Sequence, residues 1–168
     1  MLNYNQFDAL IVTPALAGLQ LDTEGFHILI NGTVAHESKG GTYIKQLQGP
    51  ALGICQMEPA THDSIWQAYL PNQSIISHRL MTLCSFARAP KSSQMINDML
   101  YAVSMCAILY KWRIDSHRQD YPKTLEEAAE MWKAYYNTIN GKGTVEQFCN
   151  DYRQFTGSAK PTKGKGNS

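Results

Sequence analysis

The residue with the clearest chemical potential is Glu37, which closes an otherwise apolar segment and is followed by Ser38 and a loop that contains glycine. A carboxyl at such a boundary can face a cleft while it lies against apolar walls. Partial desolvation disfavours the charged form of a carboxyl and raises its pKa above the usual value of about 4.3. A carboxyl that stays protonated near neutral pH can protonate the oxygen of a glycosidic bond. By position alone, however, a glutamate is more often a solvated surface residue.

A second segment of interest is the run GICQMEPAT at residues 53–61. Its glycine, Gly53, permits a close approach of the backbone to another group. The amide of Gln56 both donates and accepts hydrogen bonds, which suits an N-acetyl group on a sugar. Pro59 fits the first turn of a following helix. Without the first segment, this run would be interpreted as an ordinary passage from a loop into a helix.

Together the two segments resemble the lytic transglycosylase and goose-type lysozyme superfamily. The family's glutamate-serine motif matches Glu37-Ser38, and its glycine-x-x-glutamine-x-x-proline-alanine-threonine motif matches residues 53–61. A third family motif, alanine-tyrosine-asparagine-alanine-glycine, is matched more loosely by the AYYNT run at residues 134–138. In this order, on a fitting helical pattern, the motifs indicate the family more strongly than either short motif alone.

The resemblance is strong over about Phe26 to Tyr69 and is not evident from Pro71 to Pro122. Its run from Gly32 to Trp66 is similar to the form found in phage and prophage proteins. The sequence departs from the family pattern at Glu58, where an apolar residue is common, and at Thr138, which replaces a small residue after the asparagine. These departures leave the register of the third motif open.

The resemblance implies an α-lysozyme fold with a groove for alternating N-acetylglucosamine and N-acetylmuramic acid. Glu37 would be the catalytic acid and then the base, and Ser38 and Gln56 would hold the muramyl sugar beside it. Tyr136 would orient Glu37 through its hydroxyl, although the register also allows Tyr135. The substrate-binding residues predicted in this way are Ser38, Gln56, Met57, Tyr136 and Asn137.

The number of essential carboxylates separates two reactions. An inverting hydrolase needs a base roughly 6.5–9.5 Å from the acid, and a retaining one needs a carboxylate at about 5–5.5 Å. The only acids after Glu37 in the matched motif region are Glu58 and Asp63, both at a predicted helix start that stabilises carboxylates without a catalytic task. We therefore predict a lytic transglycosylase, in which the muramyl C6 hydroxyl is the nucleophile. The alternatives are a hydrolytic lysozyme (muramidase) and a non-catalytic phage virion structural or wall-binding protein with the same fold.

The elements that must position these residues are predicted to be helices. The predicted fold class is therefore mainly α, and the expected fold is a lysozyme-like helical domain around a buried central helix. That central helix is Asp98 to Ile114, which is apolar on most faces. Apolar residues at spacings of three and four predict a helix from Thr23 to His36 that ends next to Glu37. Further helices are predicted from capping boxes at residues 124–127 and 144–147, from Thr13-Pro14 as a cap, and at residues 5–12, 59–69 and 75–86, with a loop at 38–50.

Composition predicts one globular domain over residues 1–156, with a small, polar, lysine-bearing tail at 157–168 that we expect to be disordered. The formal net charge of +1 predicts no nucleic-acid partner. The most apolar stretch, Met99 to Tyr110, is too short for a membrane span, which needs about 20 residues. The five histidines form no HxxxH or HExxH pair, so we predict no metal and no cofactor.

The four cysteines form no CxxC pair, and we interpret them as buried free thiols, with a disulfide left open if the protein works outside the cytoplasm. The N-terminus, Met1 to Asn5, lacks the basic start of a secretory signal. We therefore expect synthesis in a host cytoplasm and action on peptidoglycan glycan strands of the cell wall. Delivery would depend on a holin, as for an endolysin, or on the components of a phage particle.

Overall fold

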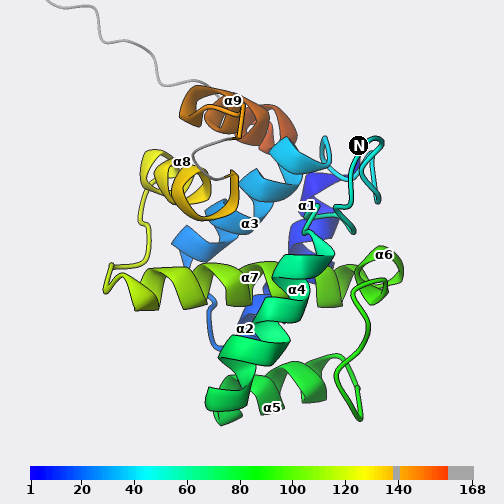
Figure 1. Cartoon of the computed structure of the whole chain (residues 1–168). Coiled ribbons are helices and arrows are strands. Elements are labelled where there is room, and N and C mark those ends of the chain that lie inside the picture. Colours follow the sequence, from blue (N-terminus) through cyan, green and yellow to red (C-terminus); the bar gives the residue numbers. More distant parts are fainter. Residues whose placement is uncertain (138–140, 159–168) are drawn as a thin grey trace, which may run out of the picture.

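The computed structural model describes residues 1–137 and 141–158. Within these ranges the chain is helical and forms no strand (Figure 1); isolated bridges join Lys45 to Leu52 and Leu52 to Met57. The prediction of a mainly α fold is therefore confirmed. Among the described helices, none has the length and apolar character needed to cross a membrane.

The longest of the described helices are α7, with 18 residues, and α3, with 14. Three five-residue stretches, named η1, η2 and η4, have the wider π-helical turn, and η3 is a turn of 3₁₀ helix. The elements are α1 (Tyr4–Phe7), η1 (Asp8–Val12), α2 (Thr13–Leu19), α3 (Glu24–Glu37), α4 (Pro59–Ser64), η2 (Ile65–Tyr69), η3 (Leu70–Asn72), α5 (Ser74–Leu83), α6 (Gln94–Asn97), α7 (Met99–Ser116), α8 (Leu125–Trp132), η4 (Lys133–Asn137) and α9 (Val145–Thr156).

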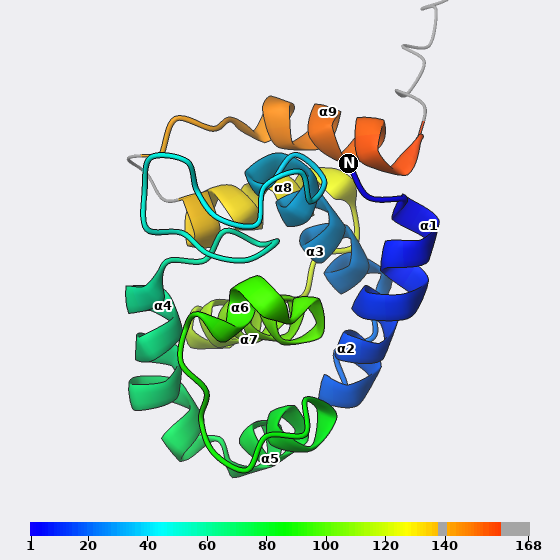
Figure 2. The same ribbon diagram turned by 90° about the vertical axis from the view of Figure 1, so that its right-hand side faces the viewer.

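Helix α7 is the buried centre of the fold, as the sequence predicts. Every residue from Tyr101 to Tyr110 is buried, and so is Ile114 one turn further on. The helix begins at the predicted place, because the side chain of Asp98 accepts a hydrogen bond from the backbone N–H of Tyr101. Figure 2 shows α7 in the middle of the molecule, with α1 and α2 on one side and α4 on the other.

Helix α3 is the second buried element and ends at Glu37. Its residues from Gly25 to Ala35 are buried, apart from His27. A hydrogen bond of 2.7 Å between the hydroxyls of Thr33 and Tyr110 joins α3 to α7. At Gly32 an added Cβ would lie 2.1 Å from the ring of Phe148, so only glycine allows α9 to pack this closely on α3.

The local start signals have mixed outcomes. Thr144 and Gln147 form the predicted capping box in full. Thr124 caps α8, but the Glu127 carboxylate accepts from the N–H of Lys123 and not from that of Thr124. The prediction that Thr13 is an N-cap is wrong, because the chain is helical without a break from α1 to α2.

The π turn η1 explains the continuous helix through Thr13-Pro14. Pro14 has no N–H, and its ring would clash with a carbonyl in the interior of a regular α-helix. The N–H of Thr13 donates to the carbonyl of Asp8, so the hydrogen-bond register has already shifted by one residue where the proline begins. The wider turn thus admits a proline that would otherwise end the helix.

Two other helix ends differ from the predicted ones. Helix α5 ends at Leu83, three residues before the expected end at Phe86. The helical run that starts at Pro59 continues through η2 and η3 to Asn72.

All four cysteines are free thiols, and only Cys84 is less than fully buried. Most of the predicted tail, residues 159–168, lies outside the described residues.

An ionic cluster fixes the N-terminal helices to α3. His27 hydrogen-bonds Asp8 through Nδ1 at 2.9 Å and Asp22 through Nε2 at 2.8 Å, and Asn31 donates to the same Asp8 carboxylate. Burial lowers the pKa of His27, but the hydrogen bonds and charges of the two carboxylates outweigh it and raise the pKa above its usual value. The imidazolium can donate to both carboxylates at once, which the neutral ring cannot do.

The first prediction concerns the pH dependence of this cluster. Because the pKa of His27 is raised on folding, its stabilising effect is complete below about pH 6.5, the unfolded value, and is lost as the pH rises through the folded pKa. His27→Gln should therefore reduce the free energy of unfolding by about 1 kcal/mol at pH 5.5 and by clearly less at pH 9. Urea unfolding at both pH values measures this, with the exposed His78→Gln as a control. An equal loss at both values would contradict it.

Candidate active site

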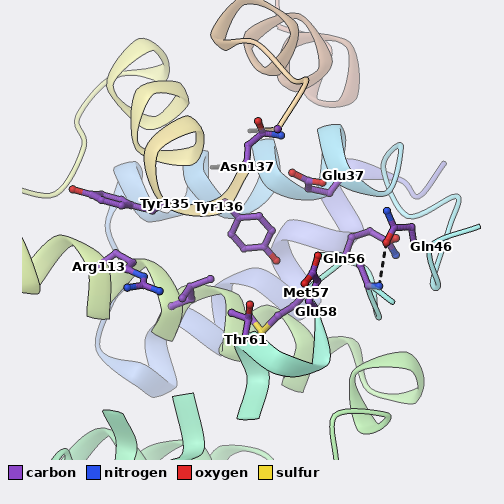
Figure 3. Close-up of a pocket in the computed structure, with 13 residues that line it drawn as sticks. Glu37, Gln46, Gln56, Met57, Glu58, Thr61, Arg113, Tyr135, Tyr136 and Asn137 are labelled. Atoms are coloured by element: carbon purple, nitrogen blue, oxygen red, sulfur yellow. Dashed lines mark hydrogen bonds between the residues drawn. The ribbon is translucent and has the colours of Figure 1, made fainter. Parts of the chain in front are cut away.

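Glu37 lines a cavity of about 580 Å³ that lies between loop 38–58, α4, α7 and η4. Figure 3 shows lining side chains gathered from these four elements and Glu37 from the end of α3. Most of the predicted site residues lie together here, and both candidate tyrosines of the third motif line the cavity. The lining residues are Glu37, Gln46, Ala51, Gln56, Met57, Glu58, Thr61, Leu109, Arg113, Tyr135, Tyr136, Asn137 and Gly141.

A second cavity of about 340 Å³ adjoins the first. It is lined by Tyr43, Leu47 and Gln48 of loop 38–58, and it shares three residues with the larger cavity: Glu37, Gln46 and Gln56. Glu37 therefore stands where the two cavities meet. A ligand that contacts this carboxyl can extend away from it in two directions, which is what a polymer cut within its chain requires.

Ser38 does not take part in this groove, although the resemblance implied that it would bind the sugar. Its side chain is fully buried, its hydroxyl donates to the carbonyl of Val34 at 2.9 Å, and it accepts from the N–H of Gly41 at 2.9 Å. The hydroxyl turns back onto the last turn of α3 and holds the following loop there. The prediction of a substrate contact by Ser38 is wrong for this arrangement.

Gln56 is placed by an uncommon backbone conformation. Its φ of 51° lies in the left-handed region, which costs energy for a residue with a side chain and is often found at functional sites. The preceding Gly53 has a φ of 73°, and a Cβ there would lie 2.4 Å from the carbonyl of Met95. The Nε2 of Gln56 donates to the carbonyl of Gly53 at 2.8 Å, which leaves its Oε1 as the group available to a ligand.

Gln46 is a site residue that the motifs did not reveal. Its backbone N–H donates to the carbonyl of Ala51 at 2.9 Å, and its Oε1 accepts from the N–H of the same residue at 3.2 Å. Its Nε2 has no hydrogen-bond partner among the described residues. Gln46 and Gln56 thus present an amide donor and an amide acceptor beside Glu37. Nothing in the sequence around Gln46 indicated this, because the loop fold alone turns the side chain into the groove.

The carboxyl of Glu37 is half-buried, and among the described residues its one hydrogen bond comes from Trp132. Burial raises the pKa of Glu37, and three weaker effects oppose the increase: the Trp132 Nε1–H donated to Oε1 at 2.9 Å and the charges of His36 and Lys39. Trp132 is fully buried, and its ring stacks on Phe148 with centroids 5.0 Å apart. The indole therefore reaches the carboxyl from a fixed position.

His36 acts behind this pair and not on a ligand. Its ring packs edge-on against Trp132, with centroids 4.6 Å apart, and its Nδ1 hydrogen-bonds Asp151 at 2.7 Å. Both contacts are those of a packing residue. It is not among the residues that line either cavity.

Tyr136 lines the cavity, but its hydroxyl does not bind Glu37. It donates to the carbonyl of Cys55 at 2.7 Å, while its ring stacks on Tyr110. The prediction that the Tyr136 hydroxyl orients Glu37 is therefore wrong, and Trp132 has that position. The contact with Cys55 instead fixes the chain just before Gln56, so Tyr136 supports the loop. Tyr135 points the other way and donates its hydroxyl to Gln119.

Asn137 and Glu58 complete the candidate site, whereas Asp63 lies outside it. The Oδ1 of Asn137 accepts from Lys133 at 2.8 Å, so its amide nitrogen is the group left to face the cavity. Glu58 is exposed, lines the cavity and makes no side-chain cap to α4. Asp63 instead pairs with the buried His62 at 2.8 Å and lies outside the cavity lining. No group of three or more described acidic, histidine or cysteine residues has a metal-binding arrangement.

Comparisons of the chain with protein-family models, with curated proteins and with solved structures found no match to any of them.

The second prediction follows from the Trp132 contact. The donated N–H favours the ionised carboxyl, so its removal in Trp132→Phe should raise the pKa of Glu37 further. The pKa can be measured by NMR titration of the side-chain carboxyl carbon. Trp66→Phe is a suitable control because its indole N–H donates to Tyr101 and not to Glu37. An unchanged or lower pKa in Trp132→Phe would show that this hydrogen bond is not formed in solution.

Proposed function

We propose that this protein is a peptidoglycan-degrading enzyme that cleaves the bond between N-acetylmuramic acid and N-acetylglucosamine, in the manner of a lytic transglycosylase. The observation that carries the proposal is the position of Glu37, a carboxyl of raised pKa at the junction of two cavities. Resemblance in the motifs suggests the same acid independently. A lysozyme-like arrangement of the helices and a phage origin belong to the same proposal.

The groups beside Glu37 suit an acetamido sugar. The Nε2 of Gln46 can donate to the acetyl oxygen, and the Oε1 of Gln56 can accept from the acetamido N–H. Met57 and the ring of Tyr136 supply apolar surface in the larger cavity, and Tyr43 and Leu47 supply it in the smaller one. Sugars bind to such mixtures of amide groups and apolar faces, because they carry hydroxyls at their edges and C–H groups on their faces.

In the proposed reaction Glu37 acts twice. Its protonated carboxyl first donates the proton to the glycosidic oxygen, and the bond between that oxygen and C1 of the muramyl sugar breaks. The substrate's own acetamido oxygen stabilises the positive charge that develops at C1. The Glu37 carboxylate then takes the proton of the C6 hydroxyl while the C6 oxygen forms the new bond to C1. The product is an anhydro-sugar, no water is consumed, and Glu37 ends protonated as it began.

Trp132 would be a positioning residue in this cycle. Its N–H holds Oε1 of Glu37 at 2.9 Å, so the carboxyl keeps one orientation toward the junction of the cavities. The same bond stabilises the carboxylate that exists between the two proton transfers. Burial works in the opposite direction and favours the protonated acid that the first step needs.

A hydrolytic lysozyme is the second candidate, and one observation favours it. Glu58 lies in the same cavity as Glu37, and its carboxylate is bound neither to the helix start nor to a cation among the described residues. Such a carboxylate is free to activate a water molecule or to act as a nucleophile. Asp63 is a weaker candidate because His62 already holds it outside the cavity lining.

The third prediction tests Glu37 itself. Glu37→Gln should reduce the rate of cell-wall lysis at least about 100-fold, since a general acid contributes roughly 10²–10⁴ to the rate. The neutral amide can still accept from Trp132, so the variant should fold, and circular dichroism checks this. Glu24→Gln at the other end of α3 is the matched control and should lyse walls like the parent. Equal lysis by Glu37→Gln and the parent would support the non-catalytic, wall-binding alternative.

The fourth prediction separates the two reactions. Mass spectrometry of digested peptidoglycan should find anhydromuramic ends, lighter by one water than hydrolysis products. Glu58→Gln should keep an activity close to the parent's, because it removes no contact that the proposed transition state needs. Reducing-end muramic acid as the main product, with an inactive Glu58→Gln, would decide for a lysozyme.

A further inference from the structure

Arg113 lies at the end of the larger cavity away from Glu37. It stands one helical turn after Leu109 on α7, and both residues line the cavity (Figure 3). The guanidinium lies over the ring of Trp112, 4.9 Å from its centroid. This stacking restricts the side chain and leaves the N–H groups at the edge of the guanidinium free to contact a ligand.

The charge of Arg113 has no counterpart in the described part of the chain. No described carboxylate lies within ion-pair distance of it, and the nearby Asp115 pairs with Lys111 at 2.7 Å instead. The carboxyls of Glu37 and Glu58 share the cavity with Arg113 but form no ion pair with it. The cavity therefore has an acidic part around the proposed reaction centre and a positive charge that is not neutralised at its other end.

A second positive charge borders the same cavity. The ammonium of Lys133 donates to the Oδ1 of Asn137 and to the carbonyl of Gly141, each at 2.8 Å, and both acceptors belong to lining residues. Lys133 has no carboxylate partner among the described residues either. Figure 3 shows Asn137 nearer to Glu37 than to Arg113, so Lys133 adds positive charge to the cavity as a whole, and Arg113 is the cation of the far end.

We propose that the Arg113 end of the cavity binds a carboxylate carried by the glycan, an inference that rests on the proposed function. Two parts of peptidoglycan supply this group: the lactyl group of muramic acid when no peptide is attached, and the peptide stem when one is. A guanidinium binds a carboxylate through two parallel hydrogen bonds. The carboxylate of Glu58 repels the same anion from the other part of the cavity.

This arrangement would select the bond that is cut. Only the muramyl sugar carries the lactyl group or the stem, whereas N-acetylglucosamine carries neither. A carboxylate held at Arg113 therefore places the strand in one register and one direction relative to Glu37. Without that anchor, Gln46 and Gln56 would bind the two kinds of sugar about equally well, because both sugars bear the acetamido group.

The fifth prediction is tested by binding, so that it does not depend on turnover. Isothermal titration calorimetry is performed in the Glu37→Gln background with three soluble ligands: peptide-bearing glycan fragments, the same fragments freed of peptide by an amidase, and chitin oligosaccharides. We expect the Glu37→Gln protein to bind at least one of the carboxylate-bearing ligands more tightly than chitin oligosaccharides of equal length. Adding Arg113→Gln should weaken that binding about tenfold, as removal of a charge-assisted hydrogen bond does, and leave chitin binding unchanged.

The matched control is Arg118→Gln, which removes the same charge at an exposed position near the end of α7 that lines neither cavity. It should change none of the three affinities. A loss confined to peptide-bearing fragments identifies the stem as the source of the carboxylate, and a loss confined to peptide-free fragments identifies the lactyl group. Equal weakening for chitin, or no weakening at all, would overturn the inference. Retained carboxylate binding in a protein that cleaves no wall would refute the proposed function alone.

Discussion

The contact between Trp132 and Glu37 depends on the close packing of three helices. Gly32 lets Phe148 of α9 lie directly on α3, and Phe148 in turn stacks on Trp132 of α8. The indole is thereby held where its N–H reaches the last residue of α3. A larger residue at position 32 would push α9 outward and leave Trp132 without its support. The position of one carboxyl thus follows from the absence of one side chain a turn and a half earlier in the same helix.

Desolvation and hydrogen bonding act on this carboxyl in opposite directions. Burial against α8 favours the protonated form of Glu37, whereas the Trp132 N–H and the nearby charges of His36 and Lys39 favour the ionised form. His36 is itself held by Asp151, whose negative charge also lies close to Lys39. Burial is the largest of these effects, so the pKa of Glu37 is raised. Under the proposed reaction, an acid that gives up and then recovers a proton would benefit from such opposing effects.

The parts of the fold that the sequence predicted are those set by local rules. Thr23 and Thr144 start helices because their side chains reach backbone N–H groups three residues away, and the apolar composition of α7 requires burial. The directions of side chains at the site could not be predicted in this way. Ser38 turns inward because the chain bends just after α3. Trp132 lies 95 residues from Glu37, so only the tertiary fold brings the two together.

The π turn η4 shows how the backbone itself shapes the groove. Three consecutive residues, Tyr135, Tyr136 and Asn137, all line the cavity, although neighbours on a regular α-helix point about 100° apart. Figure 3 shows Tyr135 and Tyr136 pointing in different directions, so the turn places their side chains along different parts of the cavity wall. Such turns have poorer hydrogen-bond geometry and occur mostly as single turns, often at functional sites. The sequence left the register open between the two tyrosines because it departs from the family pattern at Glu58 and Thr138, and the fold brings both tyrosines to the cavity wall.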